Sequence, residues 1–334
     1  MTETNSSSGV SATASPARPI LVAQDLCRSY GPRQALRGLS FTLEAGRILG
    51  FLGPNGAGKT TSIRILTTIL EPSSGSFSVA GIDHRQPDQI RRRIGVLPEN
   101  LGFPKQMTGF EYLTFFGRLY GRSADDARAT ARRLLEDVGM QGRGRSLIGT
   151  YSHGMRQRIG IARALVNDPA VVFLDEPTLG LDPRGQQELL GLVRRIAKER
   201  NAGVILCSHL LWEIEKICDD VVILSSGQVI VAGSVREVMG KSQRGGIRIT
   251  VQPAALGEAQ RLLSELPELT GVAPVPEVAG CLRMEFKSSA SDNHRDNNRI
   301  LNTLIRAKIP ILSFGVESGR LEEVFLQLTD KGIK

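Results

Sequence analysis

The sequence of 334 residues predicts an α/β protein built on a parallel sheet, followed by a small α+β domain. Two apolar runs predict the sheet. The run "ILGFL" (48–52) stops at a glycine-rich loop that leads into a helix, and "VVFL" (171–174) stops at two carboxylates. The third observation is the order of elements beyond residue 246, βαββαβ, which is typical of a split βαβ domain.

Composition favours a globular protein that stays inside the cell. Apolar residues make up 41% of the chain and charged residues 23%, which is ordinary for a globular protein. Cys27, Cys207, Cys218 and Cys281 form no paired motif, so we expect reduced thiols and no disulfide framework or metal knuckle. No apolar stretch reaches the roughly 18 residues of a membrane span, and the start of the chain lacks the apolar segment of a secretory signal. We therefore expect a cytosolic protein that does not itself cross a membrane.

The net charge of +8 leaves the kind of partner open. Anionic lipid, nucleic acid, a nucleotide or simply a solvated arginine-rich surface would each account for it. Aromatic residues make up 5% of the chain, and the sequence shows no array of aromatic and basic residues suited to stacking bases. We therefore expect no nucleic-acid partner.

The first part of the chain alternates strands with turns. Residues 1–19 are rich in serine, threonine and alanine, which is typical of a disordered tail. Residues 19–26 and 39–53 predict strands, the second interrupted by a turn at Ala45-Gly46. A helix is expected over 59–70, and two further strands over 76–81 and 93–99.

The middle of the chain is predominantly helical. Two helices are expected to begin at Thr108 and Ser123, each of which has an acidic residue three positions on that favours a capped start. Strands and helices alternate again after residue 169. A further helix is expected to begin at Asp182, where Pro183 follows, and a last short one at Ser234.

The glycine-rich segment 240–246 is typical of a linker, so we expect three parts. These are a tail over 1–19, a main domain over 20–240 and an accessory domain over 247–330. In the accessory domain the pattern predicts strands over 247–252, 270–275, 281–287 and 310–316, and helices over 254–265, 298–307 and 320–329.

The segment "GPNGAGKT" (53–60) has the spacing of a phosphate-binding loop and stands between a strand and a helix. Glycines let successive backbone N–H groups surround an anion, and the helix N-terminus adds its dipole. Lys59 is expected to reach the β- and γ-phosphates of a nucleotide, and the Thr60 hydroxyl to ligate Mg²⁺. The binding residues expected here are Gly53, Pro54, Asn55, Gly56, Ala57, Gly58, Lys59, Thr60 and Thr61.

Asp175 and Glu176 follow an apolar strand, and ligands of open parallel sheets bind at the carboxyl ends of the strands. We expect Asp175 to hold Mg²⁺ and Glu176 to polarise the water that attacks the γ-phosphate. His209 follows another apolar strand and is expected to point at the same phosphate. The alternatives are a solvated strand end for the carboxylates and a structural role for the histidine.

One family shows these segments in the same order. The phosphate loop, "YSHGM" (151–155), "VVFLDE" (171–176), "LGLD" (179–182) and "SH" (208–209) resemble the motifs of ATP-binding-cassette (ABC) ATPases. The resemblance covers residues 20–240. It implies a P-loop NTPase with a parallel-sheet core, an antiparallel β subdomain and a helical subdomain, beside which the accessory domain would be ferredoxin-like.

The resemblance also implies roles for residues outside the phosphate loop. Tyr30 looks like the aromatic residue that stacks on adenine, the alternative being a core tyrosine at a strand end. Ser152 and Gly154 match the signature motif, which contacts the γ-phosphate of ATP bound to an opposing subunit. The segment ending at Asp182 matches the loop that crosses the dimer interface. Glu99 stands where the family usually has a glutamine that senses Mg²⁺ and the membrane partner. A dimer around two ATP, of identical or different chains, is therefore implied.

The sequence departs from the family pattern in the signature motif and at Glu99. The signature usually reads Leu-Ser-Gly-Gly-Gln, so His153 replaces a glycine and Met155 an amide. The hydroxyl, backbone N–H and helix dipole that bind an anion are retained. Glu99 adds a negative charge beside the phosphates, so we expect activity to persist with altered metal or pH sensitivity.

Several segments look like the drug-resistance type of exporter ATPase, among them "YSHGMRQR" (151–158) and "LEEVFLQLTD" (321–330). Such proteins carry one cassette and a C-terminal domain and work under separately encoded membrane-spanning permease subunits. This implies a peripheral position on the inner face of the cell membrane. The apolar side chains over 102–120 are either core or a contact surface for such a permease. The alternative is a soluble cassette ATPase acting on ribosomes or DNA, which a single cassette without large insertions disfavours.

Overall fold

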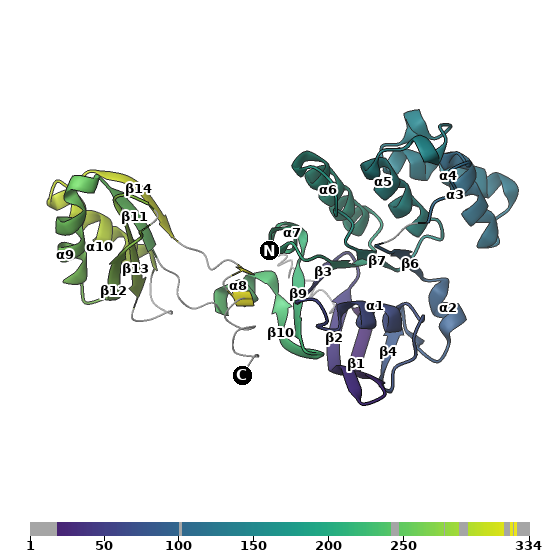
Figure 1. Cartoon of the computed structure of the whole chain (residues 1–334), viewed down its shortest axis with the longest axis horizontal. Coiled ribbons are helices and arrows are strands. Elements are labelled where there is room, and N and C mark those ends of the chain that lie inside the picture. The colour runs from purple at the N-terminus through teal and green to yellow at the C-terminus, as the bar shows by residue number, and fades with distance from the viewer. Residues whose placement is uncertain are drawn as a thin grey trace, which may run out of the picture. The chain divides into compact units, whose positions relative to one another are not determined.

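The computed structural model describes residues 19–99, 102–241, 247–276, 278–286, 293–316, 321–322 and 324–325. The chain divides into two compact units whose boundary falls between Ile230 and Val231, and Figure 1 labels the elements of both. Most of the expected tail, the expected linker from residue 242 onward and most of the expected last helix lie outside the described residues.

The central sheet has six strands in the order β10-β9-β3-β8-β7-β6, and its edge strand β10 runs across the boundary between the two units. Its strands are β3 (Ile48–Leu52), β6 (Ile94–Leu97), β7 (Val171–Asp175), β8 (Gly203–Cys207), β9 (Asp220–Ser225) and β10 (Gln228–Ser234). The pairs from β9 through β6 are parallel. β3 and β8 are buried over their whole length, as expected of parallel strands covered on both faces.

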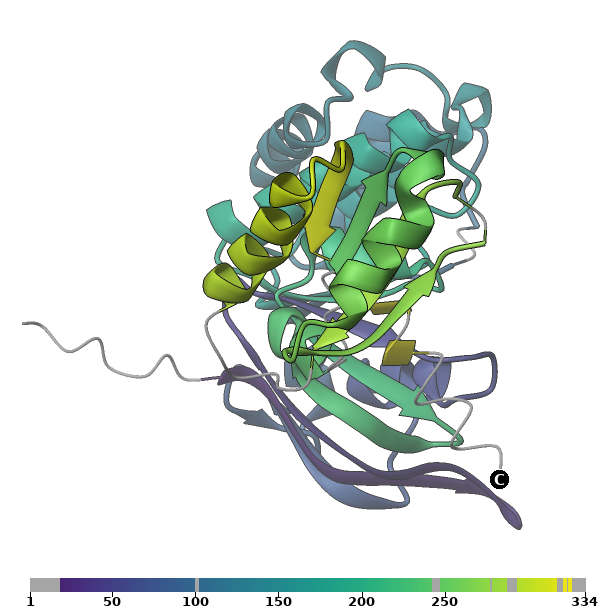
Figure 2. The ribbon, with the colours of Figure 1, turned by 90° about the vertical axis from the view of Figure 1, so that its left-hand side faces the viewer.

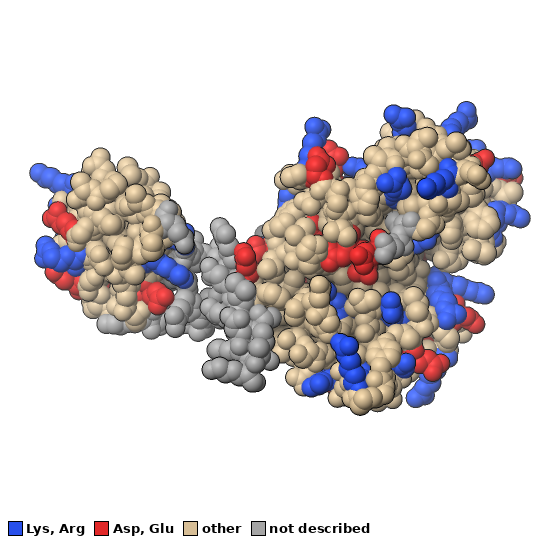
Figure 3. Space-filling view, in the orientation of Figure 1, with Lys and Arg blue, Asp and Glu red and all other residues tan. Residues whose placement is uncertain are grey.

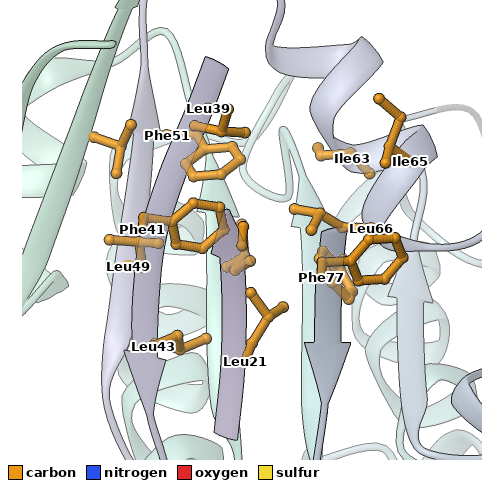
Figure 4. Packing of buried hydrophobic residues seen from close by; sticks show 14 of the residues in the cluster. Leu21, Leu39, Phe41, Leu43, Leu49, Phe51, Ile63, Ile65, Leu66 and Phe77 are labelled. Atoms are coloured by element: carbon orange, nitrogen blue, oxygen red, sulfur yellow. The ribbon is translucent and has the colours of Figure 1, made fainter. Parts of the chain in front are cut away.

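An antiparallel sheet in the order β2-β1-β4-β5 packs against the strand that precedes the glycine-rich loop. Its strands are β1 (Pro19–Tyr30), β2 (Arg33–Glu44), β4 (Ser74–Val79) and β5 (Ile82–Asp83). Phe41 of β2 meets Phe51 of β3 edge to face, with ring centroids 5.2 Å apart, in the apolar cluster that Figure 4 shows. This cluster joins the two sheets and fixes β3 in place.

Seven α-helices are described in the first unit. They are α1 (Lys59–Leu66), α2 (Pro87–Arg91), α3 (Gly109–Leu119), α4 (Ala124–Asp137), α5 (His153–Ala164), α6 (Pro183–Glu199) and α7 (Leu211–Ile217), with short 3₁₀ turns at Gln141–Arg143 and Ile148–Thr150. In Figure 1, α3–α5 lie at one end of the unit and the antiparallel sheet at the other, with the central sheet between them.

The expected helix starts are confirmed. The Thr108 hydroxyl accepts from the backbone N–H of Glu111, whose carboxylate accepts in return from the N–H of Thr108 at 2.9 Å. Asp182 caps α6 by accepting from the N–H of Gly185 at 3.2 Å. α1, by contrast, ends at Leu66 rather than at residue 70, because Thr68 adopts a left-handed backbone, with φ of 61°, that cannot continue a helix.

The second unit contains the predicted βαββαβ order. Its elements are α8 (Val235–Lys241), β11 (Ile247–Val251), α9 (Leu256–Ser264) after a 3₁₀ turn at Pro253–Ala255, β12 (Leu269–Pro274), β13 (Cys281–Phe286), α10 (Asn293–Arg306) and β14 (Ile311–Val316). The sheet is antiparallel in the order β12-β13-β11-β14. Figures 1 and 2 show α9 and α10 on the same face of it, so the expected ferredoxin-like arrangement is confirmed.

None of the helices in the described part of the chain is long and apolar enough to cross a bilayer.

Candidate functional site

The loop between β3 and α1 requires glycine at two positions. Gly53 has φ of 158°, and a Cβ there would lie 2.4 Å from the carbonyl oxygen of Leu224. Gly58 has φ of 108° and is the N-cap of α1, where a Cβ would lie 3.0 Å from the carbonyl oxygen of Ala35. No other residue type fits this path, in which the loop wraps closely around the start of α1.

Lys59, the first residue of α1, lies across this loop. Its Nζ donates to the carbonyl oxygen of Gly53 and, at 3.2 Å, to that of Pro54. The ammonium group is therefore held next to the free N–H groups at the start of the helix. Together they form a site of positive potential for an anion.

A cleft of about 690 Å³ opens over the loop and is the larger of the two clefts that contain predicted residues. It is lined by Tyr30, Arg33, Ala35, Pro54, Asn55, Gly56, Ala57, Gly58, Lys59, Thr60, Thr61, Arg64, Glu99, Asp175, Glu176, Leu179 and His209. The structure thus brings together most of the residues that the sequence singles out. In Figure 3, acidic side chains gather in the hollow between the part with α3 and α4 and the part with β1 and β2.

Sequence reasoning missed two cationic residues of this cleft, Arg33 and Arg64. Arg64 lies one turn beyond Thr60 on α1, so the helical period alone carries a signal for it. Arg33 begins β2, directly after the turn that follows Tyr30, and its position depends on the path of that turn.

The acidic side of the cleft lies at the end of β7. The pKa of Asp175 is raised to about 6, first because the side chain is partly buried and then because the negative charges of Glu176 and Glu99 lie nearby. Lys59 and Arg64 act in the opposite direction. A carboxylate with this environment favours a bound cation, because a cation would offset the repulsion among the three acids.

Glu176 and His209 form a pair at the ends of neighbouring parallel strands. The imidazole Nδ1 lies 2.8 Å from the Glu176 carboxylate oxygen Oε2. Glu176 adopts a left-handed backbone with φ of 48°, and its N–H donates to the carbonyl oxygen of Cys207 at 3.0 Å. A non-glycine residue in this region is strained, so the surrounding structure holds the carboxylate in a conformation that the residue itself does not prefer.

Tyr30 lies at the end of β1, with 42% of its surface exposed beside the cleft. The guanidinium carbon of Arg28 lies 5.1 Å from the centroid of its ring. The Arg28 side chain is itself fixed by a hydrogen bond of 2.8 Å to the carbonyl oxygen of Glu71. The ring is thereby held by a cation–π contact rather than buried in the core.

Ser152, Gly154 and Asp182 line a separate cleft of about 330 Å³. Ser152 is the N-cap of α5 and accepts from the N–H of Met155 at 3.3 Å, so the helix start expected there is present. None of these three residues lines the cleft over the phosphate loop.

Comparison with known proteins identifies the family. The model of the ABC transporter family matches residues 36–179. The daunorubicin resistance ATP-binding protein DrrA3 of Streptomyces coeruleorubidus is 36% identical over 92% of this chain and 95% of its own length. The chain belongs to the ABC transporter family. As a member it is an ATP-binding ATPase, and the predicted fold and family are confirmed.

Two further comparisons match two thirds or more of this ABC ATPase. The linearmycin resistance ATP-binding protein LnrL of Bacillus subtilis is 31% identical over 94% of this chain and 100% of its own length. A solved ATP-binding subunit of an ABC transporter is 30% identical and superimposes with a TM-score of 0.59, covering 67% of this chain and 93% of that one. The cassette architecture is shared with that structure.

Proposed function

We propose that this ABC ATPase is the ATP-hydrolysing subunit of a membrane exporter and that it acts as a dimer beneath membrane-spanning permease subunits. The observation that carries the proposal is the Glu176–His209 pair, which meets at 2.8 Å beside the phosphate loop. Relatives named for resistance to daunorubicin and linearmycin support export as the direction of transport. The proposed location is the inner face of the cell membrane.

ATP is proposed to bind with its phosphates on the loop 53–61. The N–H groups at the start of α1 and the ammonium of Lys59 offer donors to the phosphate oxygens. Adenine would then stack on Tyr30, whose ring Arg28 holds in place.

Mg²⁺ is the proposed metal cofactor, and the donor set fits it. Thr60, Asp175 and Glu99 all line the cleft and offer hard oxygen ligands. Within the described residues no three His, Cys, Asp or Glu side chains cluster closely enough to hold a metal by themselves, which suits an ion whose other ligands are phosphate oxygens and water. Bound there, Mg²⁺ would neutralise charge on the phosphates.

Glu176 is the proposed general base. Phosphoryl transfer depends mainly on positioning and charge, so the role of this carboxylate is to orient the attacking water and accept hydrogen bonds from it. His209 supports it through the 2.8 Å contact. Glu176, with its left-handed backbone, is among the residues that line the cleft.

The separate position of the signature residues supports a dimer. Ser152, Gly154 and Asp182 line a different cleft from the phosphate loop of the same chain. In the proposed dimer, Ser152 and the start of α5 face the γ-phosphate of the ATP bound by the other cassette. Each hydrolytic site is then complete only when two cassettes meet.

An exposed apolar surface supports the membrane partner. α3 begins ten residues after Glu99, and on it Phe115 and Leu119 are 54% and 67% exposed, followed by Tyr120 at 43%. Neighbouring exposed side chains of this size are typical of a surface that another protein covers. We assign this surface to the permease.

The experiment uses a tagged Glu176→Gln chain expressed in its native host. The substitution should leave ATP binding intact and abolish turnover, which holds the ATP-bound complex together. Membranes are solubilised with ATP and Mg²⁺, and co-purifying proteins are identified by mass spectrometry. The expected result is a multi-span membrane protein in about equal amount to the tagged chain.

Glu136→Gln is the matched control, because Glu136 is an exposed carboxylate on α4 that lines neither cleft. It should hydrolyse ATP at the wild-type rate. Recovery of ribosomes or nucleic acid in place of a membrane protein would overturn the exporter. Wild-type turnover by the Glu176→Gln chain would overturn the assignment of the base.

A further inference from the structure

A fully buried carboxylate contacts two residues that adjoin cleft-lining residues in the chain, without itself lining the nucleotide cleft. Glu213 of α7 has an exposed fraction of 0%, and so have its two partners, Thr178 and Ser208. None of the three lines the cleft. A buried polar group costs free energy unless it is fully hydrogen-bonded, so its partners indicate what it does.

Both oxygens of this carboxylate are occupied. The Thr178 hydroxyl donates to Oε1, and the Ser208 hydroxyl donates to Oε2 at 2.7 Å. The Ser208 oxygen also accepts from the backbone N–H of Leu210 at 3.0 Å. The cluster is therefore a closed set in which each hydroxyl is oriented by the carboxylate.

These partners stand next to the two residues that form the proposed hydrolytic pair. Thr178 is two residues beyond Glu176, and Ser208 immediately precedes His209. The carboxylate of Glu213 thus bridges the loop after β7 to the turn after β8. The two segments also meet directly at the 2.8 Å contact of Glu176 with His209.

We propose that Glu213 is a positioning residue for ATP hydrolysis. It holds Thr178 and Ser208, and thereby keeps the side chains of Glu176 and His209 in their productive positions at the γ-phosphate. The inference rests on the proposed function of that pair. Its physical basis is that small displacements of a reacting group from its productive position cost large factors in rate.

Apolar packing, rather than this carboxylate, holds α7 against the sheet. Ile214 and Ile217, its apolar neighbours on the helix, are 0% and 3% exposed. Ile214 packs so closely on β3 that a Cβ at Gly50 would lie 2.7 Å from its Cγ2 atom. An apolar residue at position 213 would fill the space without the cost of burying a charge, a cost that also shows as a raised pKa of Glu213. What the carboxylate adds is the orientation of two hydroxyls.

The test compares Glu213→Gln with wild type in the full-length protein. The amide keeps the size of the side chain and one acceptor oxygen. Its NH₂ group, however, replaces a carboxylate oxygen that accepts a hydrogen bond from a hydroxyl in the wild-type protein, and an NH₂ group cannot accept. We expect kcat to fall about tenfold while KM for ATP stays within about twofold. Glu215→Gln on the same helix is the matched control and should retain the wild-type kcat.

A double-mutant cycle separates positioning from general stability. If Glu213 acts through Thr178, then Thr178→Val and Glu213→Gln remove the same constraint, and the double variant should be about as active as the slower single variant. Thermal unfolding and binding of a fluorescent ATP analogue are measured on each variant.

Two results would overturn the proposal. One is an unchanged kcat in Glu213→Gln. The other is a loss of activity that follows the loss of folded protein or of ATP binding. Neither result bears on the proposed role of Glu176 as general base, which fails instead if Glu176→Gln turns over ATP at the wild-type rate.

Discussion

His153 Nε2 lies 2.7 Å from the carbonyl oxygen of Leu179, so the first residue of α5 is hydrogen-bonded to the loop that follows Glu176. Because a carbonyl oxygen only accepts, Nε2 is the donor in this hydrogen bond. The contact is close, since a Cβ at Gly180 would lie 3.5 Å from the same nitrogen. His153, one of the residues that depart from the signature pattern, therefore ties the signature helix to this loop, and a glycine would offer no side chain for this contact.

Replacing His153 with alanine should reduce the free energy of unfolding by about 1 kcal/mol, the usual net worth of one such hydrogen bond. Urea unfolding measures the difference. His153→Gln, which keeps an N–H donor on a side chain of similar length, should recover most of the loss. Equal stability of all three proteins would show that the bond contributes nothing.

Replacing Tyr30 with alanine should weaken ATP binding by about tenfold, since loss of a stacking aromatic costs about 1.4 kcal/mol or more. Titration calorimetry on the Glu176→Gln background gives the dissociation constant without turnover. Tyr30→Trp retains an aromatic face and should bind ATP as wild type does. An unchanged affinity of Tyr30→Ala for ATP would show that Tyr30 does not stack on adenine and has a structural role only.

The parts of this fold that sequence predicts are those that local chemistry determines. The phosphate loop can be predicted because its backbone adopts positive φ values that favour glycine, and the glycines are visible in the sequence. The start of α3 can be predicted from two residues, Thr108 and Glu111, three positions apart. The βαββαβ order of the second unit likewise follows from periodicity and turn residues within each segment.

The parts that sequence does not predict depend on contacts between distant segments. Thr178, Ser208 and Glu213 are ordinary residues in the sequence. They meet because β7 and β8 are parallel neighbours and because α7, which follows β8, packs on the same sheet at β3. α7 itself has seven residues, too few for a clear helical period. The bond from His153 to the loop at Leu179 is of the same kind.

Two glycines provide a paired test of packing in the first unit. A Cβ at Gly95 of β6 would lie 2.0 Å from the carbonyl oxygen of Ala164, so Gly95→Ala should force α5 away from the sheet and cost about 1–3 kcal/mol. Gly191 of α6 has no heavy atom within 4 Å of such a Cβ, so Gly191→Ala should stabilise the protein by about 0.5–1 kcal/mol through helix propensity. Chemical denaturation of both variants measures the two effects, and a change of the same sign in both would contradict this account.

The buried carboxylate also predicts a dependence of stability on pH. Burial raises the pKa of Glu213, the charge of Glu176 adds to the rise, and His209 and the two hydroxyls oppose it. An acid with a raised pKa in the folded state contributes stability below its unfolded pKa, and this contribution is lost as pH rises through the folded pKa. Glu213→Gln cannot titrate, so its stability relative to wild type should increase as pH rises above about 4.3, the ordinary value for glutamate. Urea unfolding of both proteins at a series of pH values up to 7 measures the difference, with Glu215→Gln as the control on the same helix. A fall in the stability of Glu213→Gln relative to wild type as pH rises would mean that the hydroxyls of Thr178 and Ser208 outweigh burial and hold the pKa of Glu213 below its ordinary value.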